Sequence, residues 1–158
     1  MKVFVSVGTH PQQFNRLLKE IDRIAGKRGA FEFFAQTGNS DYEPGNFPTK
    51  RFLDEGEYAK RIGEAGIVIS HGGAGTIISC LKQGKKVVVV PRLKRFSEHT
   101  NDHQLDLARA LAGENKVISV ERMENMEKAM AMASSFRPNL TGNRKKLVKR
   151  VAGFIDSA

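Results

Sequence analysis

Short apolar runs alternate along this chain with longer stretches in which apolar residues recur every three or four positions. The short runs are mostly β-branched or aromatic and predict strands, several of them buried on both faces. They cover residues 2–7, 31–35, 51–53, 67–70, 87–90 and 116–120. The longer stretches predict helices over 14–24, 54–65 and 77–83, one that begins at Asn101 or Asp102, and two more that complete the chain.

Strands that alternate with helices predict parallel βαβ units with right-handed crossovers. We therefore expect an α/β fold, a Rossmann-like doubly wound parallel sheet with helices on both faces. Ligands of such sheets bind beyond the carboxyl ends of the strands. The loops 8–12, 71–76 and 91–104, which each follow a strand, are therefore expected to meet at one edge of the sheet.

The length and composition favour a globular protein with anionic partners. A chain of 158 residues corresponds to one domain over 1–158. The net charge of +9 favours nucleotide phosphates, nucleic acid or an acidic membrane surface. The lone Cys80 cannot form an internal disulfide, and we expect it to be a buried small apolar side chain. No apolar run approaches the roughly 18 residues that span a bilayer, and no signal peptide is recognised, so a cytoplasmic protein is expected.

The turn after the strand 67–70 is the sharpest motif in the chain. Gly72, Gly73 and Gly75 occupy three of four positions directly before a predicted helix. Glycines let backbone N–H groups approach a ligand closely, and a helix start carries partial positive charge that suits a diphosphate. The alternative is a tight turn that only packs the helix against the sheet. Neither a P-loop nor a dinucleotide fingerprint is present, which argues against an NAD-dependent oxidoreductase.

A second polar cluster lies at residues 97–104, where a helix is expected to begin. Its imidazole, carboxylate and amide groups suit the reading of sugar hydroxyls, although an ordinary capping segment has the same composition. His99 and His103 are four residues apart, but no third zinc ligand accompanies them, so we expect no metal. His10 follows the first strand and is a candidate general base.

The stretch 137–150 holds six lysines or arginines and no acidic residue. It is either a solvated basic helix face or a surface attracted to anionic lipid or to an acidic partner. No aromatic residues interleave with these basic ones, as they do in platforms that stack nucleic acid bases. We therefore expect no nucleic acid partner.

Three segments resemble one enzyme family. They are VSVGTH at 5–10, ISHGGAGT at 69–76, and VPR at 90–92 followed by EHTNDHQ at 98–104. Together they are similar to the motifs of the C-terminal-domain type of glycosyltransferase family 28, which has the GT-B fold. That family includes small bacterial exopolysaccharide glycosyltransferase subunits and the cytosolic subunit of the eukaryotic dolichol-linked UDP-GlcNAc transferase.

The resemblance implies the donor-binding half of a GT-B enzyme. The donor would be a UDP-sugar, the acceptor a lipid-linked saccharide, and catalysis would need no metal or other cofactor. A membrane-anchored acceptor-binding subunit would complete the active site and recruit this chain to the inner face of the membrane. The alternative is a non-catalytic nucleotide-binding module that regulates or scaffolds a partner.

The resemblance also assigns roles to individual residues. The substrate-binding residues that it implies are Gly8, Thr9, His71, Gly72, Gly73, Gly75, Thr76, Ser79, Arg92, Glu98, His99, Asn101, Asp102, His103 and Gln104. The glycine turn with Thr76 would hold the diphosphate, and the segment from Asn101 to Gln104 would bind the sugar. Glu98 and His99 would support that segment. Ser79 stands where related enzymes often carry an acidic residue that holds the ribose.

Overall fold

The computed structural model describes residues 1–142 and 144–156. The strands are β1 (Lys2–Ser6), β2 (Glu32–Gln36), β3 (Thr49–Lys50), β4 (Ile67–Ser70), β5 (Lys86–Val89) and β6 (Ile118–Ser119). The α-helices are α1 (Asn15–Ala25), α2 (Glu55–Glu64), α3 (Ala74–Lys82), α4 (His103–Gly113), α5 (Met126–Ser135) and α6 (Arg144–Asp156). Two short 3₁₀ helices lie at Lys94–Phe96 and Met123–Asn125.

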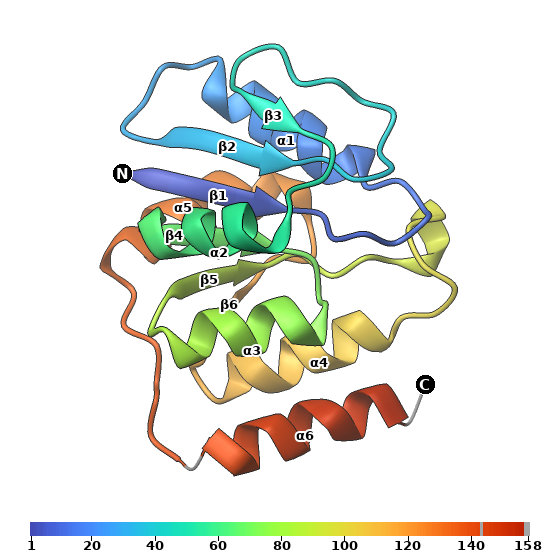
Figure 1. Ribbon diagram of the computed structural model, residues 1–158, viewed down its shortest axis with the longest axis vertical. Coiled ribbons are helices and arrows are strands. Elements are labelled where there is room, and N and C mark those ends of the chain that lie inside the picture. The colour runs from blue at the N-terminus through green and yellow to red at the C-terminus, as the bar shows by residue number, and fades with distance from the viewer. Residues whose placement is uncertain (143, 157–158) are drawn as a thin grey trace.

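All six strands run parallel in the order β3-β2-β1-β4-β5-β6 (Figure 1). The chain builds outward from β1 to β3, then returns to the centre and builds outward again from β4 to β6. This is the doubly wound Rossmann-like arrangement that the alternation of elements predicts, and the prediction is confirmed. The strand order reverses between β1 and β4, which is where such sheets bind ligands.

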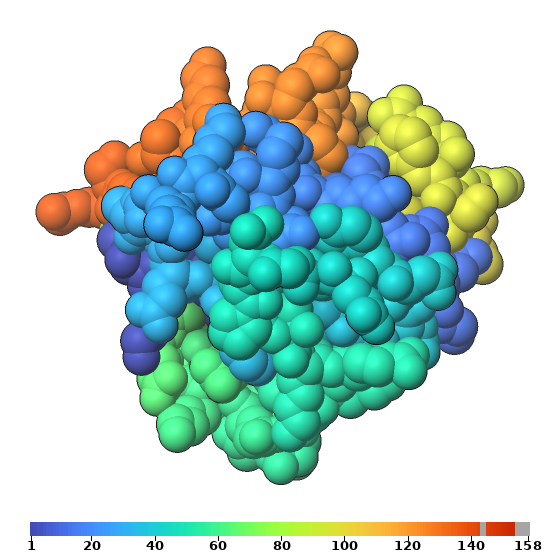
Figure 2. Space-filling model, turned by 90° about the horizontal axis from the view of Figure 1, so that it is seen from above, coloured from blue at the N-terminus to red at the C-terminus, as the bar shows by residue number. Residues whose placement is uncertain are grey.

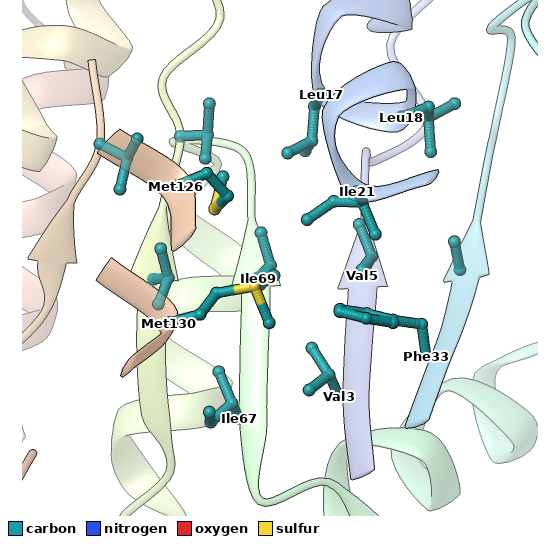
Figure 3. Close-up of a cluster of buried hydrophobic side chains, with 14 of the residues drawn as sticks. Val3, Val5, Leu17, Leu18, Ile21, Phe33, Ile67, Ile69, Met126 and Met130 are labelled. Atoms are coloured by element: carbon teal, nitrogen blue, oxygen red, sulfur yellow. The ribbon is translucent and has the colours of Figure 1, made fainter. Parts of the chain in front are cut away.

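Successive side chains of a strand face opposite layers of helices. Val3 and Val5 of β1 pack toward α1 and α5, whereas Phe4 packs toward the layer of α2, α3 and α4. Figure 3 shows the first of these clusters, with Ile21 of α1 and Met130 of α5 directed at the strands. Burial of both faces explains why β4 and β5 are apolar runs without alternation.

Most elements begin and end near the predicted residues, with instructive differences. Asp54 caps α2 as expected, because its carboxylate accepts from the Glu57 N–H at 2.8 Å. The expected strand at 51–53 is wrong by position, since β3 is Thr49–Lys50. The two residues of β3 are exposed and have no apolar pattern, and their pairing with Ala35 and Gln36 of β2 sets the register of β3. The helix expected at 77–83 begins three residues earlier, inside the glycine turn.

The outer surface is shaped by two segments that lie far apart in the sequence. The chain between β2 and α2, cyan to green in Figure 2, spreads over the face seen from above. At the opposite end of the molecule, α6 packs against α3 and α4 (Figure 1). Its Val151 is fully buried. No helix within the described residues is long and apolar enough to cross a bilayer.

Candidate functional site

A hollow of about 470 Å³ lies at the carboxyl edge of the sheet, beside the point where the strand order reverses. It brings together eight of the expected site residues: Gly8, Thr9, His10, His71, Gly73, Gly75, Thr76 and Gln104. The other expected residues do not line it: Gly72, Ser79, Arg92, Glu98, His99, Asn101, Asp102 and His103. The loops after β1, β4 and β5 thus converge as the sheet topology predicts.

The start of α3 forms one wall of the hollow. Gly73 is the N-cap, and the first helical hydrogen bond runs from the Ile77 N–H to the Gly73 carbonyl at 3.3 Å. At a helix start the first N–H groups have no partner within the helix and carry partial positive charge. No acidic side chain lies in the first turn of α3. This wall is therefore suited to bind an anion.

His71 is enclosed between two glycines. A Cβ atom on either Gly8 or Gly73 would collide with the imidazole ring, and Gly8 also has φ of +80°. Burial and the nearby positive charge of Arg92 lower the pKa of His71 to about 3. The ring is therefore neutral at physiological pH, and both glycines are needed because they leave room for it.

Gln104 determines which nitrogen of His71 carries the proton. Its Oε1 accepts from the N–H groups of Gly72 and Arg92, each at 3.1 Å. Its amide Nε2, which is a donor, lies 3.4 Å from His71 Nδ1. Nδ1 is then the acceptor, so neutral His71 carries its proton on Nε2. Gln104 thus joins the loops after β4 and β5 and gives the hollow a neutral imidazole donor.

A chain of hydroxyl groups runs beneath the start of α3. The Tyr58 hydroxyl lies 2.8 Å from both Ser6 Oγ and Thr76 Oγ1. Burial raises the pKa of Tyr58, so the phenol stays neutral and able to donate. Its ring also packs edge-on against Phe4, with centroids 5.4 Å apart. Tyr58 therefore holds Thr76 from α2, a contact that the sequence analysis missed.

Arg92 lies outside the hollow and is fully buried. Its guanidinium stacks over the Phe14 ring at 4.9 Å and donates to backbone carbonyls. These acceptors belong to Val7, Gln12, Gln13 and Glu98, at 2.6–3.1 Å. Burial lowers its pKa to about 10, so the group remains charged at physiological pH. Arg92 thus fastens the loop after β1 to the loop after β5.

Glu98 is the acidic member of the same buried cluster. Its carboxylate accepts from Arg16 Nε at 2.9 Å and Nη2 at 3.0 Å, and from the Leu93 N–H at 2.9 Å. The ion pair with Arg16 closes the cluster from the side of α1. Glu98 therefore holds the loop through Arg16 and Leu93, and it presents no carboxylate oxygen to the hollow.

His10 and His99 stack on each other at the mouth of the hollow, with ring centroids 4.6 Å apart. Each Nδ1 accepts a backbone N–H, from Gln12 and Asn101 respectively, at 3.3 Å. Burial lowers the pKa of both histidines, and Arg92 lowers it further. The pair thus joins the loops after β1 and β5 as neutral rings, with their protons on Nε2.

The remaining polar residues of the 97–104 segment stabilise its backbone. Asn101 Oδ1 accepts from the His103 N–H at 3.1 Å, whereas the N-cap residue Asp102 accepts from the Lys94 N–H at 2.9 Å. Ser79 lies on α3, and its Oγ is 3.5 Å from Gln83 Nε2. These contacts serve local structure, so roles of these residues in sugar or ribose binding stay predictions.

Four further residues line the hollow: Gln36, Leu53, Glu55 and Tyr58. Gln36 ends β2, and its Oε1 accepts from the Leu53 N–H at 2.9 Å. The other three follow β3. The rule that ligands bind at carboxyl ends of strands applies to β2 and β3 as well, and it would have found Gln36, Leu53 and Glu55. Cys80 is buried and its pKa is raised to about 12 by burial, as expected of an inert thiol. The described residues contain no group of three or more side chains that could hold a metal ion.

Comparison with known proteins agrees with this arrangement. The model of the Glycosyltransferase family 28 C-terminal domain matches residues 2–156. The chain is 35% identical over 123 residues to the UDP-N-acetylglucosamine transferase subunit ALG13 of Homo sapiens. It is 33% identical over 120 residues to the same subunit of Mus musculus. These matches cover 69% and 70% of this chain but 10% of each relative, so the chain spans a tenth of their length.

Solved structures confirm the expected fold, a half-domain of the GT-B type. The glycosyltransferase of kitacinnamycin superposes with a TM-score of 0.67 at 18% identity, over 97% of this chain and 37% of its own. The solution structure of ALG13 superposes with a TM-score of 0.63 at 14% identity, over 95% of this chain and 94% of its own. At these low sequence identities, the superpositions show a shared fold alone.

Proposed function

Because this chain belongs to the glycosyltransferase family 28 C-terminal domain family, we propose that it is the donor-binding subunit of a two-component UDP-sugar glycosyltransferase. The acceptor in this proposal is a lipid-linked saccharide. The observation that carries the proposal is the hollow at the start of α3, where unpaired N–H groups, a neutral imidazole and a hydroxyl converge. These are donors for an oxygen-rich anion, which is the chemistry of a nucleotide diphosphate.

The diphosphate would lie against the first turn of α3. The N–H groups of Ala74, Gly75 and Thr76 supply fixed donors, and the helix dipole adds partial positive charge. The Nε2 proton of His71 is a further donor on the same hollow. When the bond between the sugar and UDP breaks, charge grows on the diphosphate, and donors held in place beforehand stabilise it. In this proposal these groups take the place of a metal ion.

The sugar would extend from the diphosphate toward Gln104, which lines the hollow. Both polar ends of the Gln104 side chain already contact protein groups, which holds the amide in one orientation. A fixed amide distinguishes sugar hydroxyls better than a mobile one, because less side-chain freedom is lost on binding. UDP-N-acetylglucosamine is the favoured donor in this proposal, because the ALG13 relatives are UDP-N-acetylglucosamine transferase subunits.

The general base would come from the second polypeptide. A base needs a free lone pair, but His10 Nδ1 already accepts from the Gln12 N–H, and the other nitrogen of the neutral ring carries the proton. His10 in this arrangement is better suited to donate. The ALG13 relatives are named as subunits of a transferase, which supports a two-chain active site. We propose that the partner is membrane-anchored, binds the acceptor, and brings this chain to the cytoplasmic face of the membrane.

A titration of the purified chain with UDP tests donor binding. In Gly75→Leu the new side chain meets no protein atom near its Cβ but enters the hollow. We expect it to weaken UDP binding by at least about tenfold, since even one lost charge-assisted hydrogen bond is worth about 1.5–3 kcal/mol. Gly63→Leu on α2 is the matched control, because its Cβ also meets open space outside the hollow. Equal UDP affinity of the two variants would refute this site.

Sugar transfer tests the enzymatic half of the proposal. The chain is added to membranes from source cells that lack it, together with a radiolabelled UDP-sugar, and label in the lipid fraction is counted. We expect transfer that depends on the chain and that Gly75→Leu reduces. If UDP binds but no lipid is labelled with any UDP-sugar, the chain is the non-catalytic nucleotide-binding module.

A further inference from the structure

A second and larger hollow, of about 810 Å³, lies between α3, α4 and α6. Leu81 and Lys82 contribute to it from the last turn of α3, whereas the first turn of α3 lines the candidate donor site. At about 1.5 Å of rise per residue, the two ends of this helix are roughly 13 Å apart. The two hollows therefore lie at opposite ends of the same helix, and neither shares a lining residue with the other.

Positive charge dominates the lining of this second hollow. The basic residues that line it are Lys82, Lys116, Lys146, Lys149 and Arg150. Glu114 is the acidic residue of the lining, and it is paired with Arg150 at 2.7 Å. Within the part of the chain that the structure describes, no acidic side chain pairs with Lys82, Lys146 or Lys149. Three ammonium groups from α3 and α6 thus face one space without a counter-charge.

The wall opposite α6 is fixed by hydrogen bonds to the end of α4. The Asn139 N–H donates to the Asn115 carbonyl at 2.8 Å, and Lys116 Nζ donates to the Asn139 carbonyl at 3.1 Å. The Thr141 N–H in turn donates to Asn139 Oδ1 at 3.0 Å. The hollow is therefore formed before any ligand arrives, which reduces the entropy lost on binding.

The floor of the hollow is partly apolar. Leu81 is buried, Leu147 is half-buried, and Leu140 is 53% exposed beside them. Apolar surface beside the lysines lowers the local dielectric constant, which strengthens their attraction to an anion. Phosphate fits this setting well, because it carries up to two negative charges and offers several oxygens that lysines bind as point charges.

We propose that the hollow between α3, α4 and α6 is a second anion-binding site, which takes a phosphate group at a place separate from the donor site. The phosphate belongs either to a soluble phosphorylated compound or to the headgroup of an anionic lipid. The proposal does not depend on the donor-binding function, because it involves different residues and a different end of α3.

Two measurements on the full chain test the site and identify the source of the phosphate. The first follows backbone amide resonances by NMR while inorganic pyrophosphate is added. The second measures co-sedimentation with phosphatidylglycerol-containing vesicles and with pure phosphatidylcholine vesicles. Each is repeated with Lys82→Glu/Lys149→Glu and with the matched control Lys60→Glu/Lys128→Glu, which changes the net charge equally at exposed positions outside the hollow.

If the hollow binds a soluble phosphate compound, we expect pyrophosphate to shift the amide resonances of residues 139–142 and 145–150. If it binds a lipid headgroup, we expect the chain to sediment with vesicles only when they contain phosphatidylglycerol. A lysine near an anionic surface contributes about fivefold to partition, so we expect the hollow variant to lose at least about tenfold while the control keeps most of its binding. A response to pyrophosphate identifies a soluble phosphorylated compound as the source of the phosphate, and sedimentation with anionic vesicles identifies a lipid headgroup. Equal losses in both variants, or no binding in either arm, would overturn the proposal. Shifts confined to residues 72–76 would also overturn it while leaving donor binding intact.

Discussion

The two ends of α3 use basic residues in opposite ways. At the carboxyl edge of the sheet, the buried guanidinium of Arg92 is surrounded by carbonyl oxygens, and Arg16 is paired with buried Glu98. At the other end, the ammonium groups of Lys82 and Lys149 face an open hollow. The positive charge near the donor site is used to fasten loops, so backbone N–H groups are left to meet the ligand. The positive charge near α6 remains available for a ligand of its own.

We expect the largest effect when the buried positive charge of Arg92 is removed. Arg92→Met takes away the donors to the carbonyls of two loops and leaves these oxygens buried without partners. Each buried carbonyl oxygen left without a donor costs about 1–3 kcal/mol, so the loss of several should cost about 3–5 kcal/mol in all. We expect a loss of this size in the free energy of unfolding, measured with urea. A loss below about 1 kcal/mol would show that Arg92 does not fasten the loops.

A smaller effect, dependent on pH, is expected from His71. Its pKa is about 3 in the folded protein, against an ordinary value of 6.5. Between these values the unfolded chain binds the proton and the folded protein does not, so stability is lost as pH falls below about 6.5. Each pH unit below 6.5 lowers the free energy of unfolding by up to about 1.4 kcal/mol, so the accumulated loss at pH 5 is about 2 kcal/mol.

The measurement is the free energy of unfolding between pH 7 and pH 5, compared with that of His71→Asn. Burial also lowers the pKa of His10 and His99, and both act in the same direction. The variant should therefore lose stability less steeply than the wild type but still lose some. Identical slopes would contradict the enclosure of a neutral His71 between Gly8 and Gly73.

Tyr58→Phe should lower the free energy of unfolding by up to about 2 kcal/mol, because two hydrogen bonds worth roughly 1 kcal/mol each are lost. The change leaves the ring in place against Phe4 but removes the partner of Ser6 and Thr76. We also expect UDP affinity to fall a few-fold, because Thr76 is no longer held. Unchanged affinity would show that the hydroxyl chain serves stability alone.

The smallest effect is expected at the other end of α3. Lys149→Met makes the same kind of change as Arg92→Met, a basic side chain replaced by methionine, but on an exposed face. The free energy of unfolding should change by no more than about 0.5 kcal/mol. If Lys149→Met lowered the free energy of unfolding as much as Arg92→Met, the basic residues at the two ends of α3 would not differ in their structural role.

Apolar patterning predicted most of the fold because it is a local property. The strand at Ile67–Ser70 is found residue for residue, since an apolar run stands between Gly66 and the glycine turn. The edge strand Thr49–Lys50 has no such pattern and exists because β2 offers it a partner. The early start of α3 was missed because glycines are poor helix formers, and the turn is held by contacts with His71 and Gln104.

The candidate site was predicted less completely, since its parts depend on distant contacts. The loops after β1, β4 and β5 were expected to meet because parallel strands end at one edge. The burial of Arg92 was not foreseen, because its acceptors come from residues as far away as Val7. Tyr58 was missed because its position opposite Thr76 depends on how α2 packs beside α3.

The most direct test of the account is an amide NMR titration of the wild-type chain with UDP. We predict that the largest shifts belong to the N–H groups of residues 73–76 and that the His71 Nε2 proton becomes protected from solvent. Residues 139–150 should remain unchanged at low UDP concentration. If UDP binds while the resonances of 73–76 stay in place, the start of α3 does not hold the diphosphate and the central claim is wrong.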